Sequence, residues 1–509
     1  MSSQKQVRVR FAPSPTGGLH LGGVRTALFN YLFAKQHQGK FILRVEDTDQ
    51  TRFVPGAEEY IQECLAWCGL IPDESPLNEG KFGPYRQSER KPSYRKFAED
   101  LVAKGFAYYA FDTAEELDQQ RQLHPNFRYS HENRMDLRNS LSLSEEETAK
   151  LLADGTPHTI RIKMPENEVV SFEDMIRGRV SFETKLVDDK VLLKADGMPT
   201  YHLAVVVDDH AMEISHIFRG EEWLPSAPVH ILLWEYLGWK DEMPEWAHLP
   251  LILKPDGNGK LSKRDGDRLG FPVYAMNWQD PKTGDLTKGF RELGFLPEAF
   301  VNMLALLGWN DGTDQEIFTM DELIAKFSVD RISKSGAKFD FEKAKWYNQE
   351  WIKYTANNVL LPQVNAVLEE HQLAADKFGD NFTNSILDLV KERLIYVEDY
   401  WEQASFFYVK PEKYDVDAVK PKWNSDKTAF FQSIAQLFQE QENWNAEVLE
   451  PLFKEQIAAS GMKMGELMMP YRIMLVGGKF GPDVFKITEL LGKEEVLERI
   501  QLALPAFEG

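Results

Sequence analysis

The stretch Arg10-Phe-Ala-Pro-Ser-Pro-Thr-Gly-Gly-Leu-His20-Leu-Gly-Gly23 decides how this sequence is interpreted. Just before it, Val7 to Phe11 alternates as a short strand, and the two prolines and two glycines that follow force a loop. From Leu21 the apolar residues recur at helical spacing, and Phe41 to Val45 is a second apolar strand. Strand, loop, helix and strand in this order predict the opening of a parallel α/β sheet, with a nucleotide site at the carboxyl end of the first strand.

The loop carries groups that suit a phosphate. Glycines beside a helix N-terminus let backbone amides approach a phosphate, and His20 adds a side-chain donor. A glycine-rich loop alone is also compatible with a simple tight turn and an incidental histidine. The full string is more specific than its glycines, and we interpret it as a phosphate-binding loop.

A second signal is Lys260-Leu-Ser-Lys-Arg264, which follows the flexible segment Asp256-Gly-Asn-Gly259. Clustered Lys and Arg on a mobile loop suit the β- and γ-phosphates of ATP, where negative charge develops as pyrophosphate leaves. A solvated basic loop is the alternative. A P-loop is not present, because Lys254 stands where its first glycine should be.

Length and charge limit the classes of protein. A chain of 509 residues should divide into several domains. Its net charge of −21 argues against non-specific DNA binding but leaves room for a folded RNA held by local basic strips, such as Arg331 to Lys345. No apolar run is long enough to cross a bilayer, and Met1 to Arg10 lacks an apolar signal core, so we expect a cytoplasmic protein with no membrane partner.

The two cysteines, Cys64 and Cys68, lie four residues apart in a predicted helix from Glu58 to Gly69. Neither a third cysteine nor a nearby histidine completes a metal site, and two cysteines cannot form a disulfide framework. We interpret them as buried, reduced thiols.

The pattern of apolar residues changes several times along the chain. Between Arg90 and Gly197 it indicates a domain inserted into the sheet, and strand character returns at Leu203 to Val207. Beyond Phe341 helical patterns dominate, and the polar segment Phe271 to Gly289 is predicted to be a surface loop. The predicted division is a Rossmann-like α/β domain in two parts (1–90 and 201–264), an inserted α+β domain (91–200), a connecting domain (265–340) and an all-helical region (341–509).

Further motifs occur in a fixed order. They are Ala12-Pro-Ser-Pro-Thr-Gly17, Glu46-Asp-Thr-Asp49, Gly83-Pro-Tyr-Arg-Gln-Ser-Glu-Arg90, Tyr201-His-Leu-Ala204, Asp208-Asp-His210, Arg219-Gly-Glu-Glu-Trp223 and Lys260 to Arg264. With them the chain resembles the bacterial glutamyl-tRNA synthetases, from Val9 to about Asp340 and more loosely through the helical C-terminus.

The resemblance implies a class I aminoacyl-tRNA synthetase that uses ATP and Mg²⁺ to join L-glutamate to tRNA-Glu, acting as a monomer. The α-carboxylate of glutamate would attack the α-phosphorus of ATP, and the 2′-OH of the terminal adenosine would then attack the adenylate. The family generally needs tRNA for the first step. The inserted domain would bind the acceptor stem, residues 265–340 would contact the stem, and the helical region would bind the anticodon.

The resemblance also assigns residues to the ATP end of the site. Catalytic roles fall to His20, Lys263 and Arg264. Gly23 stands where many class I enzymes carry a second histidine, so no side-chain donor is expected there. The expected ATP-binding residues are Thr16, His20, Gly22, Gly23, Glu222, Lys260, Leu261, Ser262 and Lys263.

A glutamate pocket can be argued from charge. Two carboxylates and one ammonium call for two guanidinium groups and one acid, and Arg10, Arg219 and Glu46 meet that need. By resemblance, Arg10, Tyr201 and Arg219 contact the side-chain carboxylate. Ala12, Ser14 and Glu46 would hold the amino-acid end. Taken singly, Arg10 and Glu46 could be surface ion-pair partners, and Tyr201 a core residue.

Some relatives carry a cysteine-rich zinc site in the inserted domain. The corresponding stretch here, Tyr108-Tyr-Ala-Phe-Asp112, has no cysteine, and His124 and His131 lack thiolate partners. We therefore expect no zinc and no metal ligands from the protein.

Four alternatives stay open. A non-discriminating enzyme would also charge tRNA-Gln with glutamate, and Arg393 lies where relatives read the anticodon, although it could be an ordinary surface arginine. Glutaminyl-tRNA synthetases have a Pro-Glu-Pro-Asn-Gly motif in the first loop and an anticodon part rich in β structure. The short glutamyl-queuosine synthetase paralogue lacks the helical C-terminus. A non-enzymatic RNA-binding module would have no use for Lys263 and Arg264.

Overall fold

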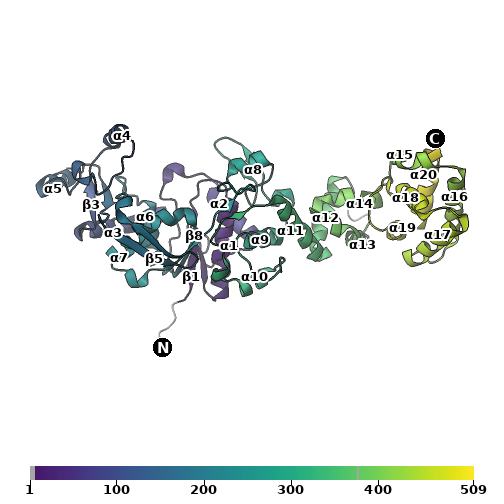
Figure 1. Ribbon diagram of the computed structural model, residues 1–509, viewed down its shortest axis with the longest axis horizontal. Coiled ribbons are helices and arrows are strands. Elements are labelled where there is room, and N and C mark those ends of the chain that lie inside the picture. The colour runs from purple at the N-terminus through teal and green to yellow at the C-terminus, as the bar shows by residue number, and fades with distance from the viewer. Residues whose placement is uncertain (1–5, 375–377, 509) are drawn as a thin grey trace, which may run out of the picture. The chain divides into compact units, whose positions relative to one another are not determined.

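The computed structural model describes residues 6–374 and 378–508 (Figure 1), with the side chains of Lys263, Arg264 and Asp267 outside the description. The chain divides into two compact units. The first runs to Leu293 and resumes at Pro297–Ala344, and the second contains Gly294–Leu296 and the chain from Lys345 onward. None of the described helices is long and apolar enough to span a membrane.

Two adjoining sheets, β1-β2 and β6-β5-β9-β8, form the centre of the first unit and are mostly parallel. The pairs β1 with β2, β8 with β9 and β5 with β9 are parallel, and β6 pairs with β5 in antiparallel fashion. The backbone N–H of Ser215 donates to the carbonyl of Arg8 at 2.9 Å, which links the start of β8 to β1. The strands are β1 (Arg8–Phe11), β2 (Lys40–Leu43), β5 (Val169–Asp174), β6 (Gly178–Glu183), β8 (His216–Gly220) and β9 (Glu245–Leu249).

The predicted opening of the sheet is confirmed. Helix α1 (Leu21–Gln36) connects the parallel strands β1 and β2, and the proline- and glycine-containing loop lies between β1 and α1. His20 is the N-cap residue of α1, because its Nδ1 accepts a hydrogen bond from the backbone N–H of Gly22 at 3.4 Å. The loop therefore places His20 at the start of a helix beside the carboxyl end of β1.

The predicted strand at Leu203 to Val207 is wrong, because these residues belong to helix α6 (Tyr201–Ala211). The five consecutive apolar residues are all buried, and α6 packs against α3, α7 and β7. A short helix covered on several sides shows the same unbroken apolar run as a central strand, so periodicity alone could not separate the two. Its last turn presents Asp208 and Asp209, both buried.

Residues 91–200 contain a separate antiparallel sheet in the order β3, β4, β7. Phe271 to Gly289 differs from the predicted surface loop. Only its tip is exposed, while its base is buried and includes Trp278, whose Cγ would lie 2.9 Å from a Cβ added to Gly18. The backbone N–H of Leu21 also donates to the carbonyl of Val273 at 3.0 Å. The polar residues that suggested a loop are concentrated at the tip, and the aromatic base braces the His20 loop.

The remaining elements of the first unit are short helices and strands, among them the three strands of the β3-β4-β7 sheet. They are α2 (Ala57–Trp67), α3 (Lys91–Ala103), β3 (Ala107–Ala110), α4 (Ala114–Leu123), α5 (Glu145–Ala153), β4 (Thr159–Ile162), β7 (Val191–Leu193), α7 (Ala227–Tyr236), β10 (Ile252–Leu253), α8 (Lys263–Leu269), β11 (Trp278–Gln279), β12 (Leu286–Thr287), α9 (Pro297–Leu306), α10 (Met320–Lys326) and β13 (Ala337–Lys338). Both cysteines are free and buried, as predicted.

The described residues of the second unit form helices joined by loops and contain no strand, which confirms the prediction for the C-terminal region. Aromatic rings fill its core, with Tyr471 of α18 packed against Phe453 of α17 at 4.8 Å between ring centroids. The helices from Phe341 onward are α11 (Phe341–Tyr354), α12 (Asn357–Glu370), α13 (Asp380–Val390), α14 (Tyr400–Tyr408), α15 (Val416–Val419), α16 (Ser425–Glu440), α17 (Ala446–Ser460), α18 (Met464–Val476), α19 (Val484–Leu491) and α20 (Lys493–Glu508).

Candidate active site

A cavity of about 1130 Å³ opens at the carboxyl ends of β1 and β8, in the first unit. Side chains from α1, α6 and the loop before α8 complete its walls. The cavity brings together Arg10, Ala12, Ser14, Thr16, His20, Gly22, Gly23, Glu46, Tyr201, Arg219, Glu222, Lys260, Leu261 and Ser262.

Three of the predicted site residues are not among the residues described as lining this cavity. The side chains of Lys263 and Arg264 lie outside the described residues, although the backbone of both begins helix α8. Arg393 belongs to the second unit, where it is exposed. The two signature segments are thus joined at one site through Lys260 to Ser262.

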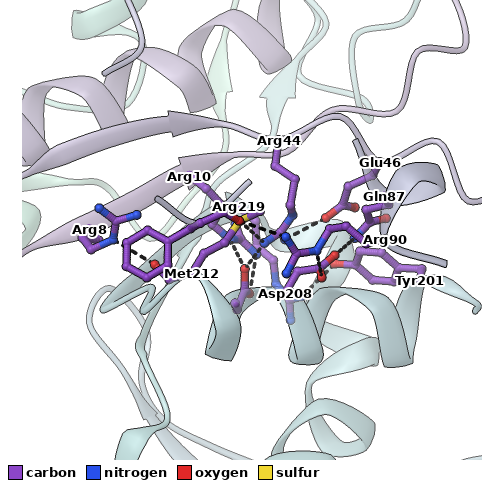
Figure 2. A network of polar contacts seen from close by, with 12 residues as sticks. Arg8, Arg10, Arg44, Glu46, Gln87, Arg90, Tyr201, Asp208, Met212 and Arg219 are labelled. Carbon is purple, nitrogen blue, oxygen red and sulfur yellow. Dashed lines mark hydrogen bonds and ion pairs between the residues drawn. The ribbon is translucent and has the colours of Figure 1, made fainter. Parts of the chain in front are cut away.

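Arg10 and Glu46, which line one wall of the cavity, belong to a chain of buried ion pairs that continues behind it (Figure 2). Arg10 donates to both oxygens of Asp209, at 3.0 and 3.1 Å, in a fork-to-carboxylate pair. Arg44 donates from one nitrogen to Asp209 at 2.7 Å and from another to Glu46 at 3.0 Å. Burial opposes ionisation of Asp209, but Arg10 and Arg44 outweigh it and hold the pKa of that carboxyl below its usual range.

Arg44 and Asp209 are functional candidates that sequence reasoning missed. Arg44 is fully buried and precedes Glu46 by two residues, so both side chains lie on the same side of the extended chain. Asp209 stands within the Asp208-Asp-His210 motif, to which no role was attached. Nothing local in the sequence indicates the pairing, because Arg10 and Asp209 are 199 residues apart.

Arg219 leaves β8 into the same cavity with different partners. Its Nε donates to Nε2 of His248 at 2.9 Å, and its Nη1 donates to the hydroxyl of Tyr201 at 3.0 Å and to Nδ1 of His230 at 3.2 Å. Its Nη2 is buried and has no hydrogen-bond partner among the described residues. Burial lowers the pKa of Arg219, and no carboxylate is among its hydrogen-bond acceptors in the described residues.

The buried arginines of this wall differ in their partners. Arg10 and Arg44 are paired with the carboxylates of Asp209 and Glu46, whereas the guanidinium of Arg219 has no carboxylate among its described hydrogen-bond partners. A buried charge without an opposite charge is costly, and an anion that supplies the missing partner removes that cost. The free Nη2 of Arg219 marks where such an anion can bind.

A neighbouring network fixes helix α6 and the segment after Gly83 (Figure 2). The carboxylate of Asp208 accepts hydrogen bonds from Gln87 at 2.9 Å, from Arg90 at 2.7 Å and from Tyr94 at 2.8 Å. These bonds immobilise the turn of α6 that presents Asp209, so the position of Arg10 depends on residues well outside the cavity.

At the other end of the cavity, His20 presents a donor. Because its Nδ1 accepts the N–H of Gly22, the ring proton of the neutral form resides on Nε2. That Nε2 is buried and has no hydrogen-bond partner in the described part of the chain. Burial, reinforced by the charge of Lys260, lowers the pKa of His20 to about 4, so at neutral pH the ring is an uncharged donor facing the cavity.

Lys260 forms an ion pair with Glu222 at 2.6 Å, with side chains that are 53% and 39% exposed. Ion pairs as exposed as this contribute little to stability and exchange partners readily. Lys260 is therefore a mobile cation at the mouth of the cavity, available to a phosphate that displaces Glu222.

Comparison with known proteins agrees with this geometry. Residues 6–346 match the family described as class I tRNA synthetases (E and Q), catalytic domain. The chain belongs to this synthetase family. Residues 347–504 match an anticodon binding domain, so the two matches meet close to the boundary between the two compact units.

The synthetase resembles proteins of known name along its whole length. It is 52% identical to a glutamate–tRNA ligase of Porphyromonas gingivalis, over 98% of each chain, and 52% identical to one of Flavobacterium johnsoniae, over 99% of each chain. A solved glutamate tRNA ligase from Elizabethkingia meningosepticum, in complex with its amino acid, superposes with a TM-score of 0.94. That pair is 49% identical and the alignment covers 99% of this chain and 100% of the other.

Proposed function

We propose that the protein is a glutamate–tRNA ligase, which joins L-glutamate to tRNA through glutamyl-adenylate. The names of its relatives at about half identity over the full length support the reaction. The observation that carries the choice of amino acid is the free Nη2 of Arg219, a buried guanidinium whose described hydrogen-bond acceptors include no carboxylate.

Charge matching favours glutamate over glutamine. The side-chain carboxylate of glutamate can supply the anionic partner that Arg219 lacks, whereas the side-chain amide of glutamine carries no charge. An amide that replaced the side-chain carboxylate would leave the buried guanidinium of Arg219 without an anion. In this arrangement Arg219 and Tyr201 bind the side-chain carboxylate, and Arg10, Ala12, Ser14 and Glu46 hold the rest of the amino acid.

Adenylate formation needs positioning and charge stabilisation more than proton transfer. The α-carboxylate attacks the α-phosphorus in line, and we assign no side chain as a general base. His20 donates from Nε2 to a phosphate oxygen, while Lys260 leaves Glu222 for the phosphates. ATP arrives with Mg²⁺, which neutralises its phosphates. Lys263 and Arg264 are assigned to the leaving pyrophosphate on the sequence alone, as are Thr16, Gly22, Gly23, Leu261 and Ser262 to ATP contacts.

The tRNA contacts follow the domain division. The inserted domain (91–200) binds the acceptor stem, residues 265–340 contact the stem, and the helical region (341–509) binds the anticodon arm, with Arg393 among the contacts. The match of residues 347–504 to an anticodon binding domain supports the last assignment. We place this reaction in the cytoplasm, carried out by a monomer.

The function is tested by ATP–pyrophosphate exchange with tRNA present, comparing glutamate with glutamine. Strong exchange with glutamate and weak exchange with glutamine is expected. Equal exchange with both amino acids, or none, would contradict the proposal. Charging of purified tRNA-Glu and tRNA-Gln then separates a discriminating from a non-discriminating enzyme.

A further inference from the structure

We propose that Asp174 and His248 are positioning residues that hold Arg219 in the orientation required for glutamate. Neither residue stood out in the sequence motifs, and both are fully enclosed behind the cavity wall. The inference rests on the proposed function, since it concerns how the amino-acid pocket selects its substrate.

The sheet register brings the three side chains together. Arg219 on β8 and His248 on β9 are direct partners in the parallel ladder, so their side chains project to the same face. Asp174 is the last residue of β5 and pairs with Trp246, two residues before His248 on β9. The guanidinium of Arg219 also lies over the ring of Trp246, at 4.8 Å from its centroid.

The direction of each hydrogen bond is fixed by chemistry. A guanidinium can only donate, so Nε2 of His248 accepts from Arg219 and the ring proton must reside on Nδ1. That proton is donated to Oδ2 of Asp174 at 2.6 Å. A carboxylate can only accept, so this relay has one possible arrangement of protons.

Asp174 is itself immobilised by the backbone. Its Oδ1 accepts the N–H groups of Ile176 at 3.0 Å and Arg177 at 2.9 Å, and its Oδ2 accepts that of His248 at 3.1 Å. Although burial opposes ionisation, the hydrogen bonds from His248 and from these amides hold the pKa of Asp174 below its usual range. The turn after β5 therefore fixes the carboxylate of Asp174, and the carboxylate fixes the ring of His248.

A second arm holds the other side of Arg219. Nδ1 of His230 accepts from Arg219, so its Nε2 carries the proton and donates to Nδ1 of His202, which lies 3.2 Å away. With Tyr201 as the third acceptor, the bonds from Nε and Nη1 use three of the five N–H groups of the guanidinium. The two remaining N–H groups are those of Nη2, which no described residue satisfies.

These three acceptors explain why Arg219 offers only the two N–H groups of Nη2 to a ligand, in a fixed orientation. Its acceptors are all uncharged, so they orient the guanidinium without neutralising it, and a carboxylate partner in place of His248 would remove the demand for an anionic substrate. The negative charge of Asp174 is separated from Arg219 by the ring of His248, and Asp174 fixes the tautomer of that histidine. The selectivity for an anion therefore depends on a neutral histidine between Asp174 and Arg219.

The test is steady-state ATP–pyrophosphate exchange in the full chain with tRNA present, for His248→Leu and His248→Gln. The leucine variant removes the acceptor, and its KM for glutamate should rise about tenfold or more. Its KM for ATP should stay unchanged and its preference for glutamate over glutamine should fall. The glutamine variant keeps an oxygen acceptor and should recover most of the preference. His37→Leu, a substitution of the same kind at the C-cap of α1, which does not line the cavity, should leave all of these values unchanged.

Asp174→Asn tests the relay with a side chain of the same size. Its amide nitrogen cannot accept the backbone N–H groups, so the ring of His248 loses its fixed partner, and the KM for glutamate and the preference should change in the same direction as in His248→Leu. An unchanged preference in either His248→Leu or Asp174→Asn, in an enzyme that activates glutamate, would overturn the positioning role, as would an equal loss for both amino acids. Failure of the wild-type chain to activate glutamate would instead overturn the proposed function.

Discussion

The two ends of the active-site cavity hold their charges in opposite ways. At the end proposed for the amino acid, Arg10, Arg44 and Arg219 are at most 5% exposed, and each is held by two or more hydrogen bonds. At the end proposed for ATP, Lys260 is 53% exposed and has one exposed carboxylate partner. Rigid buried charges can discriminate between two amino acids that differ by one charge, whereas a solvated cation can follow phosphates as they enter and leave. We therefore expect the buried arginines to determine which amino acid binds, and the exposed Lys260 to accompany the phosphates during each catalytic cycle.

The largest effect is expected from Asp209→Ala. The change leaves both Arg10 and Arg44 buried without their shared carboxylate, and breaking a buried pair costs about 3–5 kcal/mol. The free energy of unfolding from urea denaturation should fall by that amount. The control is Glu99→Ala, which breaks the exposed pair with Arg95 and should cost less than about 1 kcal/mol. Similar costs for the two substitutions would remove the distinction between buried and exposed charges.

The next largest effect is expected from His20→Ala, which removes the uncharged donor that faces the phosphate end. Losing one preorganised donor slows adenylate formation by about 10²–10³-fold. The KM for glutamate should change little, because His20 makes no contact with the amino-acid wall. ATP–pyrophosphate exchange measures both values, and a normal rate in the variant would exclude His20 from phosphate stabilisation.

A smaller effect concerns the dependence of stability on pH. Burial lowers the pKa of His202 from 6.5 to about 4, with smaller contributions from Lys190 and Arg219, so the unfolded chain binds this proton at a higher pH than the folded chain. The contribution to stability is present above pH 6.5 and is lost as the pH falls toward about 4. His202→Gln should therefore take up about one proton fewer on unfolding in this range. Calorimetry in buffers of different ionisation enthalpy measures the number, and an unchanged uptake would contradict the shift.

The smallest effect on stability is expected from Lys260→Ala. Its exposed pair with Glu222 should contribute less than about 1 kcal/mol to unfolding, while the KM for ATP rises. Urea denaturation and exchange kinetics measure the two quantities on one preparation. A loss of stability as large as that of Asp209→Ala would mean that the ATP end is as rigid as the amino-acid end.

Sequence alone predicted the parts of the fold that local patterns determine. The prolines and glycines between Arg10 and Gly23 located the loop, and the helical spacing after Leu21 located α1. The predicted strand at Leu203 to Val207 was wrong because a helix that is buried on several sides has no polar face from which its helical period could be recognised. The buried base of Phe271 to Gly289 was missed because its contacts with Gly18 and Leu21 are remote in sequence.

The same limit applies to the site. Residues that line the cavity were predicted because they fall in motifs, but the residues that hold them were not. Asp209, Asp174 and His248 act on partners 199, 74 and 29 residues away. Their contribution depends on sheet register and on the tautomer of a histidine, and neither is visible in a single sequence.

The central claim is that Arg219 selects glutamate by charge, and the most direct measurement is the ratio of kcat/KM for glutamate and glutamine in the wild type and in Arg219→Leu. Exchange is measured with tRNA present, and Arg219→Lys serves as the variant that keeps the charge but loses the fixed fork. We expect Arg219→Leu to lose roughly 3–5 kcal/mol in kcat/KM for glutamate and much less for glutamine, so that the ratio collapses. A variant that keeps the wild-type ratio would contradict the account and would transfer the selection to Arg10 and Tyr201.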